Sequence, residues 1–166
     1  SVGVQEGIQK LKEGVIGEVY MARGLCYKHR PSIDKKPDQA PPADLNWDLW
    51  QGPAQERAFN PNIVPYNWHW FWNYGNSDMG NQGVHQMDIA RWGLGVDLPT
   101  KISAMGGKFL FDDDKETPNV MTTSFHFPNA GPMGKMLVFD TRPFRTPQMN
   151  DEAGAGIGTL FYGSEG

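Results

Sequence analysis

The stretch from His29 to Pro65 constrains the fold more than any other part of this sequence, because it has no sustained hydrophobic period. It is rich in Pro, Asp, Asn and Gly, which predicts one long loop with short turns. A loop of this length inside a compact domain is usually functional or disordered. Five of the six tryptophans lie between Trp47 and Trp72, so we expect an ordered loop whose aromatic side chains form a loop core or a ligand platform.

Regular patterns flank this loop on both sides. Before it, Val4, Ile8 and Leu11 recur at helical spacing, and the residues from Val19 to Tyr27 alternate as those of a strand do. After it, the sequence predicts a helix over Gln82–Trp92, followed by strands at Lys101–Phe111, Val120–Phe127 and Lys135–Thr141 and a fourth candidate at Ile157–Tyr162. This order predicts an α+β fold with an open, mainly antiparallel β-sheet, helices packed on one face and a long ordered Trp-rich loop.

Three local signals refine this expectation. Asn81 is a suitable N-cap for the second helix. Gly106–Gly107 suggests a bulge in the strand that contains it. Asp112, Asp113 and Asp114 lack the spacing of a calcium-binding loop, so we expect them to form a solvated turn.

Size and composition narrow the classes of protein that this chain can represent. A length of 166 residues suits one domain with one core, which buries roughly 70% of its unfolded surface. The net charge of −4, without a basic block, argues against nucleic acid as a partner. Apolar runs are too short to span a membrane, and the N-terminal residues do not resemble a signal peptide. The single Cys26 excludes a disulfide framework and a multi-cysteine zinc site.

The most informative segment runs from Trp68 to Asp88, where a glycine-punctuated turn leads into a helix. Asn81, His85 and Asp88 are four and three residues apart, so their side chains can meet near the start of this helix. The positive end of the helix favours the uncharged imidazole, which can act as a general base. The alternative is structural, with Asn81 as a cap and His85 hydrogen-bonded in the core. Metal binding by His69, His85 and Asp88 is disfavoured, because their spacing resembles no zinc site.

Several residues are candidates for binding a substrate. Tyr27, Lys28 and Arg30 at the end of the first strand offer donors for hydroxyls or a carboxylate, although a solvated strand end is an equal alternative. In an extended chain, Trp68, Trp70 and Trp72 would share one face and could stack on a sugar ring, with His69 on the other side of the strand. The alternative is that most of these indoles fix the long loop onto the sheet.

Three segments, in order along the chain, resemble motifs of the Gfo/Idh/MocA family of oxidoreductases. Leu45–Ala54 resembles its D-W-D-x-W-L-G-P-A-P signature, Gly75–Asp88 resembles its glycine-rich stretch ending in D-x-G-x-H-x-x-D, and Glu13–Val19 resembles the G-x-I-G-x-V entry to its C-terminal domain. The resemblance extends from about Gln5 to Gly166 and is closest to a bacterial subgroup of the family.

This resemblance implies an enzyme of two domains. An N-terminal Rossmann domain would bind NAD or NADP and carry the usual catalytic lysine. Residues 1–166 would form a single, apparently truncated C-terminal substrate-binding domain, which we expect neither to be active nor to bind the cofactor tightly alone. The substrate implied is a sugar, polyol or glycoside, and the implied partners are the missing Rossmann domain and further copies of the chain packed through the β-sheet. We expect a soluble protein of the bacterial cytoplasm or an exported one.

The resemblance also assigns roles to individual residues. His85 matches the catalytic histidine of the family, and Asp88 matches a common supporting position. Many members have a carboxylate where this chain has Asn81, and an amide cannot accept a proton as a carboxylate does. Asp78 and Asp88 are the nearest substitutes. Two other functions stay open at this point: a redox-assisted glycoside hydrolase, and a carbohydrate-binding or oligomerisation module without chemistry.

Overall fold

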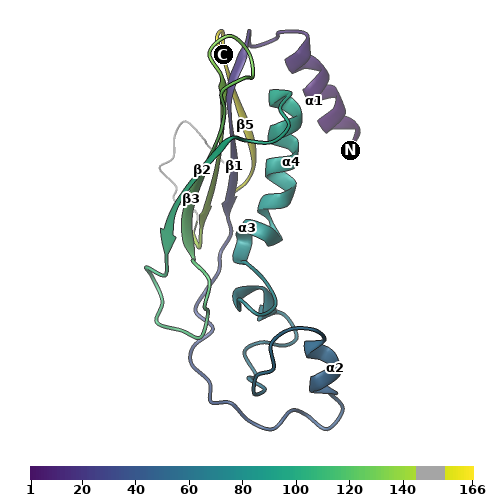
Figure 1. The fold of residues 1–166 in the computed structure, drawn as a ribbon, viewed down its shortest axis with the longest axis vertical. Coiled ribbons are helices and arrows are strands. Elements are labelled where there is room, and N and C mark those ends of the chain that lie inside the picture. The colour runs from purple at the N-terminus through teal and green to yellow at the C-terminus, as the bar shows by residue number, and fades with distance from the viewer. Residues whose placement is uncertain (145–155) are drawn as a thin grey trace.

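The computed structural model describes residues 1–144 and 156–166. Its strands form one open β-sheet, which the helices accompany (Figure 1). The helices are α1 (Val2–Lys12), α2 (Trp47–Gln51), the 3-10 helix η1 (Asn67–Trp70), α3 (Ser77–Asn81) and α4 (Gly83–Leu94). The strands are β1 (Val19–Tyr27), β2 (Lys101–Gly107), β3 (Val120–Phe127), β4 (Lys135–Arg142) and β5 (Ile157–Gly163).

The sheet has the strand order β2-β3-β4-β1-β5. β1 runs parallel to β4, and the other neighbouring pairs are antiparallel. The parallel pair arises because the chain leaves β1 through the long loop and returns through α4, β2 and β3 before it forms β4. The predicted α+β class and the open, mainly antiparallel sheet are confirmed.

Helix α4 packs closely across the middle of the sheet, and α1 lies on the same side (Figure 1). Two glycines permit this approach: a Cβ on Gly24 would lie 2.9 Å from the Cβ of Gln86, and one on Gly83 would lie 3.0 Å from the ring of Phe139. The core between α4 and the sheet contains Val19, Ala22, Ala90, Leu94, Phe127 and Leu137. This packing fixes the start of α4 against β1.

The opposite face of the sheet carries a polar centre among apolar side chains. Arg23 forms an ion pair with Asp140, whose side chain is only 2% exposed, and Thr122 donates a hydrogen bond to the same carboxylate. Met105 on this face is 83% exposed and Met136 is 39% exposed. Large apolar side chains on an open sheet face are typical of a surface that packs against another protein.

The long loop is ordered and has a hydrophobic core of its own, below the sheet in Figure 1. This core contains Trp47, Phe59, Ile63, Trp70 and Phe71. The expectation of a single core is therefore wrong. The aromatic residues of the loop bury one another instead of filling the space beneath the sheet, so a segment without hydrophobic period still forms a stable unit.

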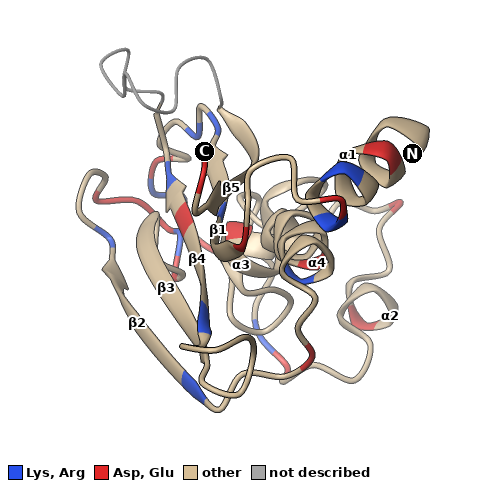
Figure 2. Ribbon diagram, turned by 90° about the horizontal axis from the view of Figure 1, so that it is seen from above, with Lys and Arg blue, Asp and Glu red and all other residues tan. Residues whose placement is uncertain are grey.

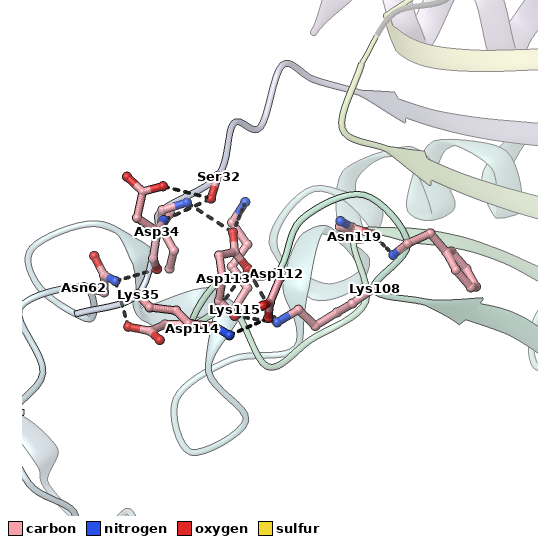
Figure 3. A network of polar contacts seen from close by, with 12 residues as sticks. Ser32, Asp34, Lys35, Asn62, Lys108, Asp112, Asp113, Asp114, Lys115 and Asn119 are labelled. Carbon is pink, nitrogen blue, oxygen red and sulfur yellow. Dashed lines mark hydrogen bonds and ion pairs between the residues drawn. The ribbon is translucent and has the colours of Figure 1, made fainter. Parts of the chain in front are cut away.

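The connection between β2 and β3 holds the long loop in place (Figure 3). The carboxylate of Asp113 accepts a hydrogen bond from the backbone N–H of Ile33 (3.1 Å) and lies 3.4 Å from the Nζ of Lys115. The carboxylate of Asp114 accepts from the backbone N–H of Lys36 and the side chain of Asn62, both at 2.9 Å. The prediction of a solvated turn here is wrong, because two of the three aspartates anchor the loop.

Three further local predictions are also wrong. No bulge is present at Gly106–Gly107, whose residues pair in register with Met121 and Val120. Asn81 does not cap α4: it ends the separate helix α3, and Gln82 is the N-cap residue, without a side-chain cap hydrogen bond. β2 ends at Gly107, four residues before the predicted end at Phe111. Just after this end, the backbone N–H of Phe109 donates to the side-chain oxygen of Asn119.

Charged residues are distributed over both helices and strands (Figure 2). Within the described residues, none of the helices is both long enough and apolar enough to cross a membrane.

Candidate functional site

The break between α3 and α4 presents all three predicted catalytic side chains at the surface. Asn81 ends α3, His85 lies in the first turn of α4, and Asp88 lies one turn further along α4. Each of the three is exposed. The side chain of Asn81 donates a hydrogen bond of 3.3 Å to Asp78, which fixes its amide group next to the helix break.

Asp78 forms a buried ion pair with Arg30 directly beneath this surface. The guanidinium donates to both carboxylate oxygens, at 2.8 Å and 3.1 Å, and the side chain of Asp78 is only 3% exposed. Arg30 also lies over the ring of Trp70 and donates to the hydroxyl of Tyr66. Ser77, which precedes Asp78, is buried and has a φ of +63°, an uncommon value for a residue other than glycine. Such strain persists only where surrounding contacts enforce it.

Lys28 connects the end of β1 to the same helix break. Its Nζ donates to the side-chain oxygen of Gln82, whose amide nitrogen donates to Gln86 at 3.1 Å. From the end of β1, Lys28 thus reaches the α3–α4 junction and Arg30 reaches the start of α3. Tyr27 is buried, and the guanidinium of Arg142 lies 4.8 Å from its ring centre.

The segment that carries Trp68, His69 and Trp70 is a 3-10 helix and not an extended strand. The two indoles therefore do not share a face: Trp68 is 40% exposed, whereas Trp70 is 3% exposed. His69 is buried, and its Nδ1 lies 2.9 Å from the carbonyl oxygen of Tyr66, so Nδ1 carries the proton. Its Nε2 has no hydrogen-bond partner among the described residues. Burial lowers the pKa of His69, which favours the uncharged ring.

These positions divide the candidate substrate-binding residues into two groups. Lys28, Arg30 and Trp68 have accessible atoms, while Tyr27, His69, Trp70 and Asp78 lie in the interior. The side chains of the second group are buried in this structure, and two of them, Asp78 and Trp70, contact the accessible Arg30.

Sequence reasoning missed a pocket of about 560 Å³ between α2 and η1. Its walls include Trp50, Trp68 and Tyr74, and the side chains of Gln51 and Asn73 also line it. We call it the tryptophan pocket. The dense aromatic content of the long loop signalled an ordered unit, but not which rings would face outward.

Other kinds of chemistry find little support in the described residues. They contain no group of three or more His, Cys, Asp or Glu side chains that could hold a metal ion. Burial raises the pKa of the Cys26 thiol to about 12, so this cysteine is not an activated nucleophile. A strand, glycine loop and helix arranged to hold a pyrophosphate are also not found in the part of the chain that the structure describes.

Comparison with known proteins gives one family match and several similar structures. The profile of the oxidoreductase family C-terminal alpha/beta domain, of the Gfo/Idh/MocA group, matches residues 17–115. The WlbA dehydrogenase from Bordetella pertussis, solved in complex with NADH and UDP-GlcNAcA, is 14% identical over 87% of this chain, with a TM-score of 0.51. A proposed oxidoreductase from Erwinia carotovora atroseptica is 14% identical over 96% of this chain, with a TM-score of 0.53.

The chain spans only about a third of the length of these two structures, 33% and 37% respectively. At such low identity the similarity establishes a shared fold. The search of curated proteins gives no significant match.

Proposed function

Because this chain belongs to the Gfo/Idh/MocA oxidoreductase family, as its C-terminal alpha/beta domain, we propose that it is the substrate-side half of an NAD(P)-dependent oxidoreductase that acts on a sugar, polyol or glycoside. The observation that carries this proposal is the placement of His85. It is exposed in the first turn of α4, four residues after Asn81, whose amide donates to Asp78 of the buried Arg30–Asp78 pair. In the family motif this position belongs to the catalytic histidine.

His85 would take a proton from a substrate hydroxyl while a hydride leaves the carbon that bears this hydroxyl. An uncharged imidazole is suited to this step, since it can accept a proton near neutral pH. The amide of Asn81 can donate or accept a hydrogen bond but cannot carry the proton. We therefore assign Asn81 a role in orienting the hydroxyl, and Asp88 a supporting role on the same helix.

The surrounding residues would hold this site rigid. Lys28 anchors Gln82 at the helix break, and its ammonium group lies where it could also meet a substrate oxygen. Arg30 and Asp78 hold the start of α3 through two hydrogen bonds. His69 and Trp70 pack behind them in the interior. A reacting group held by such a rigid framework keeps the geometry that proton transfer requires.

The described residues do not fit a dinucleotide, since they offer no glycine loop at a strand–helix junction for its pyrophosphate. We propose that a separate Rossmann domain of the same enzyme binds NAD or NADP, which would accept the hydride. We assign to the residues of this chain only the proton transfer, and not the hydride transfer. The nucleotide sugar bound to the WlbA dehydrogenase supports a sugar as the substrate class.

The test is the variant His85→Ala in the full-length enzyme, with NAD and NADP each supplied. General-base participation contributes about 10²–10⁴-fold in rate, so kcat should fall by about that factor while cofactor affinity stays nearly constant. His126→Ala is the matched control, because His126 is an exposed histidine on β3, on the face of the sheet away from α4. The assignment fails if His85→Ala retains more than about a tenth of the wild-type turnover.

A further inference from the structure

The tryptophan pocket has rigid aromatic walls. Trp50 stacks on Trp47, with ring centres 4.9 Å apart and planes 12° from parallel, and meets Tyr74 edge-on at 4.9 Å. Trp47 is itself buried in the loop core. These contacts fix the orientation of Trp50 before any ligand arrives. A preformed aromatic surface limits the entropy lost when a ligand binds.

Trp68 forms the third aromatic wall of the pocket, and part of its apolar ring is exposed to water. Trp68 is 40% exposed although its neighbours His69 and Trp70 are each 3% exposed. It lies in η1, which contacts α3, so the pocket lies next to the element that carries Asn81. An indole held at a pocket wall provides a large apolar surface with a polar N–H at one edge.

The polar groups of the pocket are amides. The side-chain oxygen of Gln51 already accepts from the backbone N–H of Arg57 (2.9 Å) and from the hydroxyl of Tyr74 (3.2 Å). Its amide nitrogen, in contrast, donates to none of the described residues. Asn73 contributes a second amide to the lining, whose oxygen accepts from Arg57 at 3.5 Å and whose nitrogen donates to the carbonyl oxygen of Gln55 at 3.1 Å. None of the residues that line the pocket, all of which the structure describes, carries a charge.

These features together select the chemistry of a ligand. A phosphate or carboxylate would need a cation or several backbone N–H groups, which the lining lacks. A pyranose ring has apolar C–H faces that suit indole and phenol rings and hydroxyls at its rim that suit amide donors and acceptors. A volume of about 560 Å³ is in the usual range of small-molecule sites and exceeds the needs of one such ring.

We propose that the tryptophan pocket is a subsite for an uncharged sugar ring, separate from the surface around His85. This inference rests on the proposed function, because it makes the substrate a saccharide or glycoside of at least two units. One unit would react at His85, and another unit of the same saccharide would lie against Trp68 and Trp50. Binding in the pocket itself needs no cofactor and no chemistry.

The test measures binding by saturation-transfer NMR on the full-length protein, with glucose, galactose, maltose, cellobiose and lactose as probes. Two variants alter the pocket: Trp68→Ala removes a wall, and Ala54→Arg fills the space from a lining position. Trp72→Ala is the matched control, since Trp72 is 59% exposed on the same segment but does not line the pocket.

The expected result is millimolar or tighter binding of at least one probe, weakened about tenfold in each pocket variant and unchanged in Trp72→Ala. The proposal is overturned if no probe binds, if either pocket variant binds as well as the wild type, or if Trp72→Ala loses as much affinity. His85→Ala separates the two proposals, because it should keep this binding. If His85→Ala binds the sugar and also keeps full turnover, the subsite stands and the proposed function fails.

Discussion

Removal of the Asp113 carboxylate should destabilise the long loop more than any other single change in the network of Figure 3. The side chains of Asp113 and Lys115 are 0% and 2% exposed. In the variant Asp113→Ala, Lys115 would keep only the carbonyl of Pro31 and the rings of Trp70 and Phe111 as partners. A buried ammonium without its carboxylate costs about 3–5 kcal/mol.

The reverse change, Lys115→Met, should cost less, about 1–3 kcal/mol. Asp113 would still accept hydrogen bonds from the backbone N–H groups of Ile33 and Lys115, at 3.1 Å and 3.2 Å, and would keep Lys108 at 3.5 Å. The double variant should cost less than the sum of the single variants, because it leaves no buried charge without a partner.

Tryptophan fluorescence during urea unfolding is the appropriate assay, since five of the six tryptophans lie between Trp47 and Trp72. Asp112→Ala serves as the control. The side chain of Asp112 is 89% exposed, so the loss of its ion pair with Lys35 should not change the free energy of unfolding measurably. A cost below about 1 kcal/mol for Asp113→Ala, or a cost equal to that of the control, would refute the assignment of Asp113 as the loop anchor.

Four other changes test separate parts of the structure. Asn81→Asp should raise kcat if a carboxylate at this position still takes part in proton transfer, as the family motif implies. A fall in kcat would instead indicate a proton path organised around the amide. Burial lowers the folded-state pKa of His69 below its ordinary 6.5, so stability should decrease as pH falls through that value, and His69→Asn should flatten this dependence in thermal melts recorded from pH 7.5 to 5. Gly93→Ala should lower the free energy of unfolding by about 1–3 kcal/mol, because its Cβ would lie 2.1 Å from the ring of Phe161, and a stabilised variant would contradict this packing. Sedimentation should show a dimer or larger oligomer that Met105→Asp weakens, and a monomer at micromolar concentration would argue against packing through the open sheet face.

The strands were predictable from the sequence because their signal is local. β1 and β3 occupy the predicted residues, and β4 and β5 differ from prediction by one residue at one end. Alternation is visible in the sequence of β1, whereas β4 is marked by a short apolar run, Met136–Phe139. The parallel pairing of β1 with β4 was not predictable in this way, since it depends on the path of the intervening chain.

The site was less predictable, because non-local contacts determine it. Gly80 and Gly83 lie close to Gln82, but they did not indicate that the chain would divide into the two helices α3 and α4. Asp113 appeared to be a solvated residue, since Ile33, which it anchors, lies eighty positions away, although its partners Lys108 and Lys115 are close in the sequence. In an extended strand, Trp68 and Trp70 would lie on the same face. Because the segment is a 3-10 helix, Trp70 is buried and Trp68 is exposed.

The anchor between the long loop and the β2–β3 connection also determines when the loop can be held in place. Its contacts join residues that are 78 to 84 positions apart, from Pro31–Lys36 to Asp113–Lys115. Closing so long a segment of free chain is entropically unfavourable, but pairing of the strands first brings the two ends together. The loop therefore acquires the contacts of this anchor only once the β2–β3 connection is present.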